Sequence, residues 1–313
     1  MALDTLATRV VVIALVMTTG GVTSSAQSGA GTSPLRLSDH VSVVLQGQPG
    51  AQSNVGIVVG RKATLVIDSG LGPKNGGILA DVVRQLAAAG ALYVAATHFH
   101  PEHMMGESGF PASAIVLRSK AQQQDIDQTG AATGGGVVAL FRQGHATDME
   151  GAIYRTPDMM FDGDLEIDLG GTRVHLMQLG PAHTRGDLGF FVEGDSVVFT
   201  GDVAMSRPLG INADSAYSSA PTNASVWLAS LERLTQLKAV HVAPSHGPLG
   251  DGSMIEKHRL LMTDVRDRVR MLKRQGRTAD QIVSTLSDEL AKKHNVPQKV
   301  VADAARLFYA ELG

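Results

Sequence analysis

Short runs of β-branched and apolar residues, separated by glycine-containing turns, dominate the chain from residue 41 onward. Val41–Val44, Val55–Val59 and Ala63–Ile67 predict a meander of antiparallel strands. In the segment 77–89 the apolar residues recur at helical spacing, and the apolar run 91–96 predicts the next strand. This part of the chain therefore reads as a meander followed by a β-helix-β unit.

The rest of the chain repeats the order of strands followed by helices. A strand and a helix are predicted at 114–117 and 119–128, and further strands at 165–169, 172–178, 188–192, 196–200 and 239–242. Helices are predicted at 224–237, 254–275, 279–293 and 298–311, whereas 130–156 and 203–222 lack a clear period. Two such blocks predict an α/β fold, an αββα sandwich in which two mixed sheets pack face to face with helices outside.

The N-terminal residues have the layout of a secretory signal peptide. A short apolar core at 10–17 follows Arg9, and small residues at Ser24 and Ala26 form a cleavage site. The apolar core is about ten residues too short for a transmembrane helix. We therefore expect a signal peptide at 1–26 with cleavage after Ala26, and export to the periplasm or the medium with no stable membrane span. A flexible leader at 27–38, a catalytic domain at 39–252 and a helical extension at 253–313 would follow.

Composition narrows the chemistry. The apolar content of 43% and charged content of 18% are those of an ordinary globular protein, and a net charge of −3 is too mild to indicate nucleic acid as a partner. The chain has no cysteine, which excludes disulfides and thiolate ligands. Any metal site must be built from His, Asp and Glu. The oligomeric state stays open.

Residues 98–103, His-Phe-His-Pro-Glu-His, directly follow the predicted strand 91–96. In an extended chain the side chains of His98 and His100 share one side, and imidazoles and carboxylates are typical ligands of zinc and similar divalent metals. Further residues of these types also come directly after short β-runs, so all could converge on one edge of the sheets. They are Asp68, His183, Asp202 and His246.

The chain resembles the metallo-β-lactamase superfamily over roughly residues 40–250, through His-x-His-x-(acid)-His, Gly-x-x-His-Thr, Thr-Gly-Asp and Ser-His-Gly. The resemblance implies two divalent metal ions, zinc first, with iron or manganese as alternatives. It assigns the first metal to His98, His100 and His183, the second to Glu102, His103 and His246, and a bridging position to Asp202. The family usually has Asp at the position of Glu102. The extra methylene moves the carboxylate by roughly 1.5 Å, so Glu102 either folds back to ligate or shifts the second site.

The resemblance also implies the reaction. A metal-bound hydroxide would attack the carbonyl of a small-molecule ester, lactone, thioester or β-lactam, with Glu102 orienting the nucleophile. Asp68 would accept an imidazole N–H from a ligand and fix its orientation, or it would simply form a turn after its strand.

Several alternatives follow from the same resemblance. The absence of cysteine excludes β-lactamases with a Cys ligand, and Asp202 resembles the glyoxalase-II and lactonase branches. Export argues against a cytosolic thioester, and no nuclease motif is found. A β-lactamase acting on antibiotics, a mononuclear iron dioxygenase of the same fold and a protein without catalysis remain as alternatives.

The remaining candidates have weaker patterns. Six histidines lack partner spacing and are expected on the surface or in strands, with His145 the one whose loop could overhang the site; they are His40, His145, His175, His241, His258 and His294. A set of Met and Phe residues could line a substrate pocket or fill the core, namely Met104, Met105, Phe141, Met159, Met160 and Phe161. Arg207 could bind an anionic substrate or be solvated.

Overall fold

The computed structural model of the chain describes residues 32–87, 90–206 and 222–312. From Thr32 onward the chain forms one compact unit. The predicted signal peptide, the first part of the predicted leader and Arg207 lie outside the described residues.

The first sheet has seven strands in sequence order, the first four antiparallel and the last four parallel to one another. The strands are β1 (Leu35–Arg36), β2 (Val41–Val44), β3 (Val55–Val59), β4 (Ala63–Ile67), β5 (Ala91–Ala95), β6 (Ile115–Ser119) and β7 (Met159–Phe161). Helix α1 (Gly72–Leu86) makes the crossover between the parallel strands β4 and β5.

The second sheet has five strands in the order β12-β11-β10-β9-β8. They are β8 (Leu165–Asp168), β9 (Arg173–Gln178), β10 (Leu188–Val192), β11 (Val197–Gly201) and β12 (His241–Pro244). Neighbours are antiparallel except β11 and β12, which are parallel and are joined through α5 (Ala224–Gln236).

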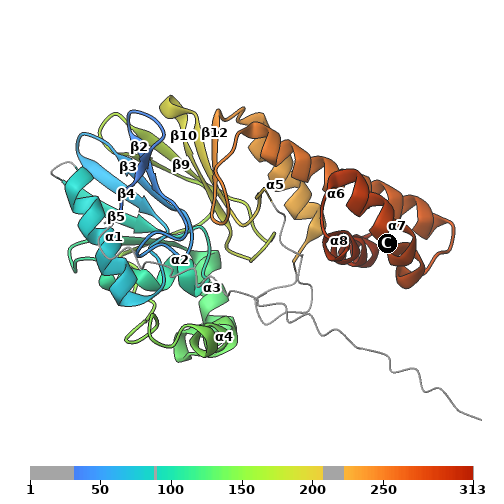
Figure 1. The fold of residues 1–313 in the computed structure, drawn as a ribbon, viewed down its shortest axis with the longest axis horizontal. Coiled ribbons are helices and arrows are strands. Elements are labelled where there is room, and N and C mark those ends of the chain that lie inside the picture. Colours follow the sequence, from blue (N-terminus) through green and yellow to red (C-terminus); the bar gives the residue numbers. More distant parts are fainter. Residues whose placement is uncertain (1–31, 88–89, 207–221, 313) are drawn as a thin grey trace, which may run out of the picture. The chain divides into compact units, whose positions relative to one another are not determined.

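The two sheets pack face to face with helices on the outside (Figure 1). Between the sheets lies an apolar layer in which Leu65 and Ile67 of β4 meet Leu176, Phe190 and Phe199 of the second sheet. Helix α1 packs on the outer face of the first sheet, and α5 and α6 (Gly252–Arg274) pack on the outer face of the second. The predicted αββα sandwich is confirmed.

The C-terminal helices continue the outer layer of the second sheet. Helices α7 (Ala279–His294) and α8 (Gln298–Glu311) share one apolar cluster with α5, α6 and strand residues Val198 and Val242. A capping box formed by Thr278 and Gln281 begins α7. The shorter helical segments are α2 (Pro101–Met104), η1 (Met105–Gly109), α3 (Lys120–Gln128), η2 (Ala131–Thr133), α4 (Gly136–Gly144) and η3 (Glu193–Asp195).

The structure corrects four local predictions. The sheet begins at Leu35, inside the segment predicted as a flexible leader, because Leu35 and Arg36 pair with β2. Residues 130–156, predicted as irregular, contain α4 and η2. Helix α1 begins at Gly72, where Pro73 fits the first turn. Met159 and Met160 belong to the edge strand β7 and are 53% and 56% exposed, so core packing does not describe them.

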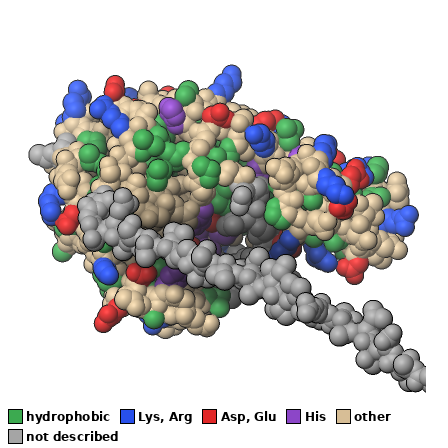
Figure 2. All heavy atoms as spheres, in the orientation of Figure 1, with side chains coloured by type: hydrophobic (Ala, Val, Ile, Leu, Met, Phe, Trp, Pro, Cys, Tyr) green, Lys and Arg blue, Asp and Glu red, His purple; other side chains and the backbone are tan. Residues whose placement is uncertain are grey.

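Charged side chains on the C-terminal helices are largely paired. Lys and Arg lie beside Asp and Glu on this part of the surface (Figure 2), and ion pairs join Arg268 to Glu289 and Arg259 to Glu256. Basic residues of α6 such as Arg259 and Arg268 thus lie in ion pairs at the surface. Among the described residues, no helix combines the length and the apolar character needed to cross a bilayer.

Candidate metal centre

The candidate ligands all lie at the carboxyl ends of strands. His98 and His100 follow β5, His183 lies between β9 and β10, Asp202 follows β11, and His246 follows β12. Glu102 and His103 lie on α2, where Pro101 occupies the first helical position after His100. The topology therefore brings seven residues from four separate segments to one edge of the two sheets.

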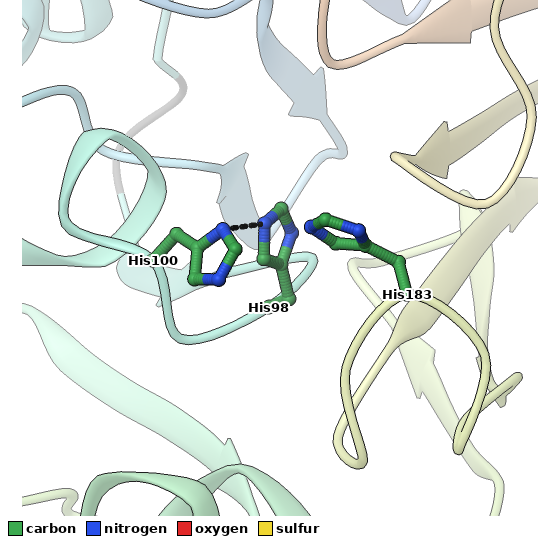
Figure 3. Close-up of side chains that lie close together, drawn as sticks. All are labelled: His98, His100 and His183. Carbon is green, nitrogen blue, oxygen red and sulfur yellow. Dashed lines mark hydrogen bonds between the residues drawn. The ribbon is translucent and has the colours of Figure 1, made fainter. Parts of the chain in front are cut away.

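His98, His100 and His183 form the first cluster, in which three rings from two loops face one another (Figure 3). Nε2 of His98 lies 3.0 Å from Nδ1 of His100. The His183 ring centroid is 4.9 Å from that of His98 and 5.0 Å from that of His100. Two imidazole nitrogens on one tetrahedral zinc, each about 2.0 Å from it, lie roughly 3.3 Å apart. The observed spacing is close to that arrangement.

Glu102, His103 and His246 form the second cluster. Oε1 of Glu102 lies 3.5 Å from Nε2 of His103 and 3.9 Å from Nε2 of His246. The carboxylate of Glu102 therefore lies at a position from which it could share a cation with both imidazoles.

Asp202 lies between the clusters. Its Oδ2 is 3.6 Å from Nε2 of His183 in the first cluster, and its Oδ1 is 3.9 Å from Nε2 of His246 in the second. The side chain is almost fully buried. Each carboxylate oxygen therefore faces a different cluster, which is the geometry that a bridging ligand requires.

Several ligand atoms at the site are buried without a hydrogen-bond partner among the described residues. They are Oε2 of Glu102, Nε2 of His103, Nε2 of His183 and Oδ1 of Asp202. Buried polar atoms in native proteins are nearly always paired, and an unpaired one needs a reason such as an ion. Four such atoms of metal-ligating types at one place fit divalent cations.

The pKa values reflect burial and close packing of charge. Burial, together with the neighbouring imidazoles, lowers the pKa of His98 well below its ordinary value. Burial also lowers the pKa of His183, although Asp202 opposes the shift. Burial opposes ionisation of Glu102, but His103 outweighs it and lowers the pKa of Glu102 to about 2. Neutral imidazoles and ionised carboxylates are the forms that bind metals.

Asp68 contacts His103 directly and His98 through Thr97. Its backbone has a φ of 66°, which turns the chain sharply after β4. Oδ2 of Asp68 lies 2.9 Å from Nδ1 of His103 and accepts hydrogen bonds from Oγ1 of Thr97 and Oγ of Ser245, both at 3.2 Å. Oγ1 of Thr97 in turn lies 3.2 Å from Nδ1 of His98. One buried carboxylate can thus orient a ligand of each cluster.

The loop that carries His183 is held by acids that the sequence analysis does not single out. Asp187 accepts hydrogen bonds from N and Oγ1 of Thr184 at 2.8 and 2.7 Å. Burial raises the pKa of Asp187 to about 8, although both hydrogen bonds oppose the shift. Asp125 of α3 accepts a hydrogen bond from N of Gly186. The position of Asp187, four residues after His183 in the same motif, is the signal that could have found it.

Most of the other histidines lie away from the centre. His40 contacts Asp195, His175 lies between Glu166 and Glu193, and His294 contacts Asp264. His145 ends α4 and stacks on Phe141, with Nδ1 3.9 Å from Asp148 rather than near a candidate ligand. His258 differs from the prediction of a surface or strand residue: it is a buried residue of α6. Met104 and Met105 are core residues behind the histidine motif.

Comparisons with known proteins agree with this geometry. The family model described as the metallo-beta-lactamase superfamily matches residues 49–246. No curated protein matches the chain.

The chain is similar to three solved structures. The stereoselective inverting sec-alkylsulfatase Pisa1 from Pseudomonas sp. has 13% identity and a TM-score of 0.69, over 90% of this chain and 50% of the alkylsulfatase. A metallo-beta-lactamase family protein from Thermus thermophilus has 17% identity and a TM-score of 0.56, over 87% and 92% of the two chains. The metallo-beta-lactamase from Pontibacter korlensis has 20% identity and a TM-score of 0.52, over 73% and 97%.

These identities establish a shared fold and no more, and the chain spans only half the length of the alkylsulfatase. The family match establishes more than the fold, because it covers most of both sheets and every candidate ligand from His98 to His246. The chain belongs to the metallo-beta-lactamase superfamily.

Proposed function

We propose that the chain is an exported, dinuclear metal-dependent hydrolase that cleaves an ester, lactone, thioester or β-lactam. The observation that carries this proposal is the position of Asp202, whose two carboxylate oxygens face His183 and His246 at 3.6 and 3.9 Å. A carboxylate between two nitrogen-rich clusters supports two cations, which in two-metal hydrolases stand about 3.5–4 Å apart.

The chain's own residues have distinct tasks in this proposal. The first cation would be held by His98, His100 and His183, and the second by Glu102, His103 and His246. Asp202 would bind both cations. Asp68 keeps Nδ1 of His103 turned toward itself, so that Nε2 is presented to the site. Histidine-rich sites of this kind are preferred by zinc, with iron and manganese as further candidates.

When bound, divalent cations lower the pKa of a coordinated water toward neutrality and polarise the substrate carbonyl. Glu102 lies at the edge of the second cluster with its pKa lowered to about 2, chiefly by His103 against the effect of burial. A carboxylate with so low a pKa accepts a hydrogen bond well but retains a proton poorly. We assign to Glu102 the orientation of the attacking water rather than the storage of its proton.

The proposal is tested by metal analysis of the chain purified without added metal, together with turnover assays. The panel contains nitrocefin, a lactone, a thioester and a carboxylic ester, and a secondary alkyl sulfate because of the fold shared with Pisa1. We expect close to two metal ions per chain and hydrolysis of a carbonyl substrate. His98→Ala and His183→Ala should lose the first metal and at least 100-fold in kcat/KM, roughly the effect of removing a first ligand.

Other outcomes of the panel identify the alternatives. One iron ion per chain together with consumption of O₂ would identify the protein as a dioxygenase instead of a hydrolase. Turnover confined to nitrocefin would assign a β-lactamase. Full metal occupancy without turnover of any substrate would leave a metal-binding protein and overturn the proposal.

Export is supported by the apolar core at 10–17 and the small residues before Gln27. Expression of the full chain with its own N-terminus, followed by mass determination of the protein in the medium or periplasm, tests it. A mature chain beginning at Gln27 is expected. Retention of residues 1–26 on protein inside the cell would contradict it.

A further inference from the structure

A cavity of about 520 Å³ lies between the segment that follows Asp202 and the C-terminal helices. Its walls come from the segment after β11, the first turns of α6 and the segment between α7 and α8. Most of its apolar wall consists of Met205, Met254, Leu260, Leu261 and Val296. A cavity of this size is within the range of pockets that bind small molecules, about 300–1,000 Å³.

One sequence relationship and one contact connect the cavity to the candidate ligands. Met205 and Ser206 line it and come three and four residues after Asp202. Oγ of Ser206 lies 3.3 Å from the position that a Cβ on Gly247 would occupy, so Ser206 touches the turn that carries His246. The cavity therefore begins beside the second cluster and extends toward α6.

His258 is a buried polar residue in the wall of this cavity. It lines the cavity, is only 2% exposed, and neither Nδ1 nor Nε2 has a hydrogen-bond partner among the described residues. An imidazole buried without partners is unusual, because a buried polar group that makes no hydrogen bond has lost its water without compensation. A ligand in the cavity could supply the missing partner.

The charge of the cavity indicates a neutral ligand. Lys293 and His294 line it, but both contact the carboxylate of Asp264. The remaining charged lining residues are Asp251 and Lys257, one of each sign. Burial lowers the pKa of His258 to about 4, so its imidazole is neutral at pH 7 and offers one donor and one acceptor.

We infer that this cavity binds the acyl or alkyl part of the substrate, an uncharged and mainly apolar group whose single hydroxyl, carbonyl or amide hydrogen-bonds His258. This inference rests on the proposed function, because the bound group is the substrate's only if the chain is a hydrolase. The existence of the binding site itself does not depend on turnover.

Trp227 provides a direct measurement of binding. It is the only tryptophan of the chain, and its ring centroid lies 5.8 Å from that of His258. Titration of the full chain with hexanamide should change the Trp227 fluorescence in a saturable way. His258→Leu should weaken the affinity at least tenfold, as expected for a lost hydrogen bond of about 1.4 kcal/mol.

Leu260→Phe is a second variant that keeps His258. Leu260 is 44% exposed at the rim of the cavity, so the larger ring narrows the cavity with little effect on folding. Met271→Phe on the same helix is 45% exposed and lies outside the cavity lining, which makes it the matched control. Hexanamide should bind less tightly to Leu260→Phe than to the wild type and equally to Met271→Phe and the wild type.

The kinetic arm uses the p-nitrophenyl esters of acetic, hexanoic and 6-hydroxyhexanoic acid. The wild type should prefer the six-carbon esters, and His258→Leu should lose the preference for the hydroxylated ester over the hexanoate. Met271→Phe, outside the cavity lining, should cleave all three esters like the wild type. If neither these esters nor any other substrate of the panel is cleaved but hexanamide binds as expected, the proposed function fails and the binding site stands. If the wild type does not bind hexanamide, or His258→Leu binds it equally well, the inference is overturned whatever esters are cleaved.

Discussion

Oδ2 of Asp68 lies 2.9 Å from Nδ1 of His103, and both side chains are almost completely buried. Burial opposes protonation of His103, but Asp68 and Glu102 outweigh it and raise its pKa well above the ordinary value. The same carboxylate reaches His98 through Thr97. Asp68 is therefore the common support of both clusters, although it is not itself a member of either.

Asp68→Asn tests this role. Asparagine tolerates the left-handed backbone of position 68, so the turn should survive. Its amide offers one acceptor oxygen where Asp68 uses both carboxylate oxygens as acceptors. We expect metal affinity to fall 10- to 100-fold, the usual effect of losing an outer-shell partner of a ligand. Competition with a chromophoric chelator measures it.

Ser245→Ala is the matched control for Asp68→Asn. Oγ of Ser245 donates a hydrogen bond to the same Oδ2 at 3.2 Å, whereas the contact of Oδ2 with the ligand His103 is made by Asp68 itself. Its loss should weaken metal binding by less than threefold, about 0.7 kcal/mol or below. Equal effects of the two substitutions would mean that Asp68 only shapes the turn.

Glu102→Asp distinguishes a site adapted to glutamate from one that merely tolerates it. From the sequence alone, restoring the usual family residue is expected to preserve or raise occupancy of the second metal. The structure reverses this expectation, because Oε1 of Glu102 already lies 3.5 and 3.9 Å from the imidazoles of its cluster. Shortening the side chain withdraws the carboxylate by roughly 1.5 Å.

We therefore expect Glu102→Asp to lose more than half of the second metal while retaining the first, as measured by elemental analysis after dialysis. Glu102→Gln keeps the length and removes the charge, and should also lose the second metal. Full occupancy in Glu102→Asp would restore the expectation drawn from the sequence.

The sequence predicts the fold and the ligand set well where a local pattern is strong. Strands such as Val55–Val59 have runs of β-branched residues bounded by turns, and the ligand candidates stand directly after such strands. The pattern is weak at β7, which is three residues long and exposed. It is also weak at α4, since the helix begins at the last of three consecutive glycines, 134–136, that read as a loop.

Contacts between distant segments explain what sequence reasoning misses. That Asp68 supports His98 through Thr97 depends on the parallel pairing of β4 with β5. The sequence analysis gives His258 no role, yet this residue lies on the buried stripe of α6 with Met254, Leu261 and Val265. A polar residue at that helical spacing is the signal that could have found it.

Gly106→Ala should disrupt the support beneath the metal centre. A Cβ at position 106 would lie 1.9 Å from the carbonyl oxygen of Ser69, next to Asp68, and 2.7 Å from that of Gly70. Backbone atoms must move to relieve such a clash. We expect a loss of more than about 3 kcal/mol in the free energy of unfolding, measured by urea denaturation.

Gly144→Ala is the control for this substitution. Gly144 is the last residue of α4 and has no atom within 4 Å of the added Cβ. Alanine favours a helix over glycine, so stability should be unchanged or raised by up to about 1 kcal/mol. A Gly106→Ala chain as stable as the wild type would show that the two backbone segments are not held in contact in solution.

His258 also predicts a pH dependence of stability. Burial lowers its pKa to about 4 in the folded chain, whereas in the unfolded chain it titrates near 6.5. Between these values the unfolded chain binds a proton that the folded chain does not, so stability falls as the pH drops from about 6.5 to 4. Over that interval the wild type should lose roughly 3 kcal/mol through this residue.

His258→Leu lacks the titrating group, so its free energy of unfolding should depend less steeply on pH in the same interval. Other ionisable groups also contribute to the pH dependence, but they contribute equally to both chains when a chelator is present. The test is the difference between the two urea-denaturation profiles at pH 4 to 8, since any packing effect of the leucine only adds a constant. Parallel profiles would show that His258 is protonated, and therefore partnered, in the folded protein.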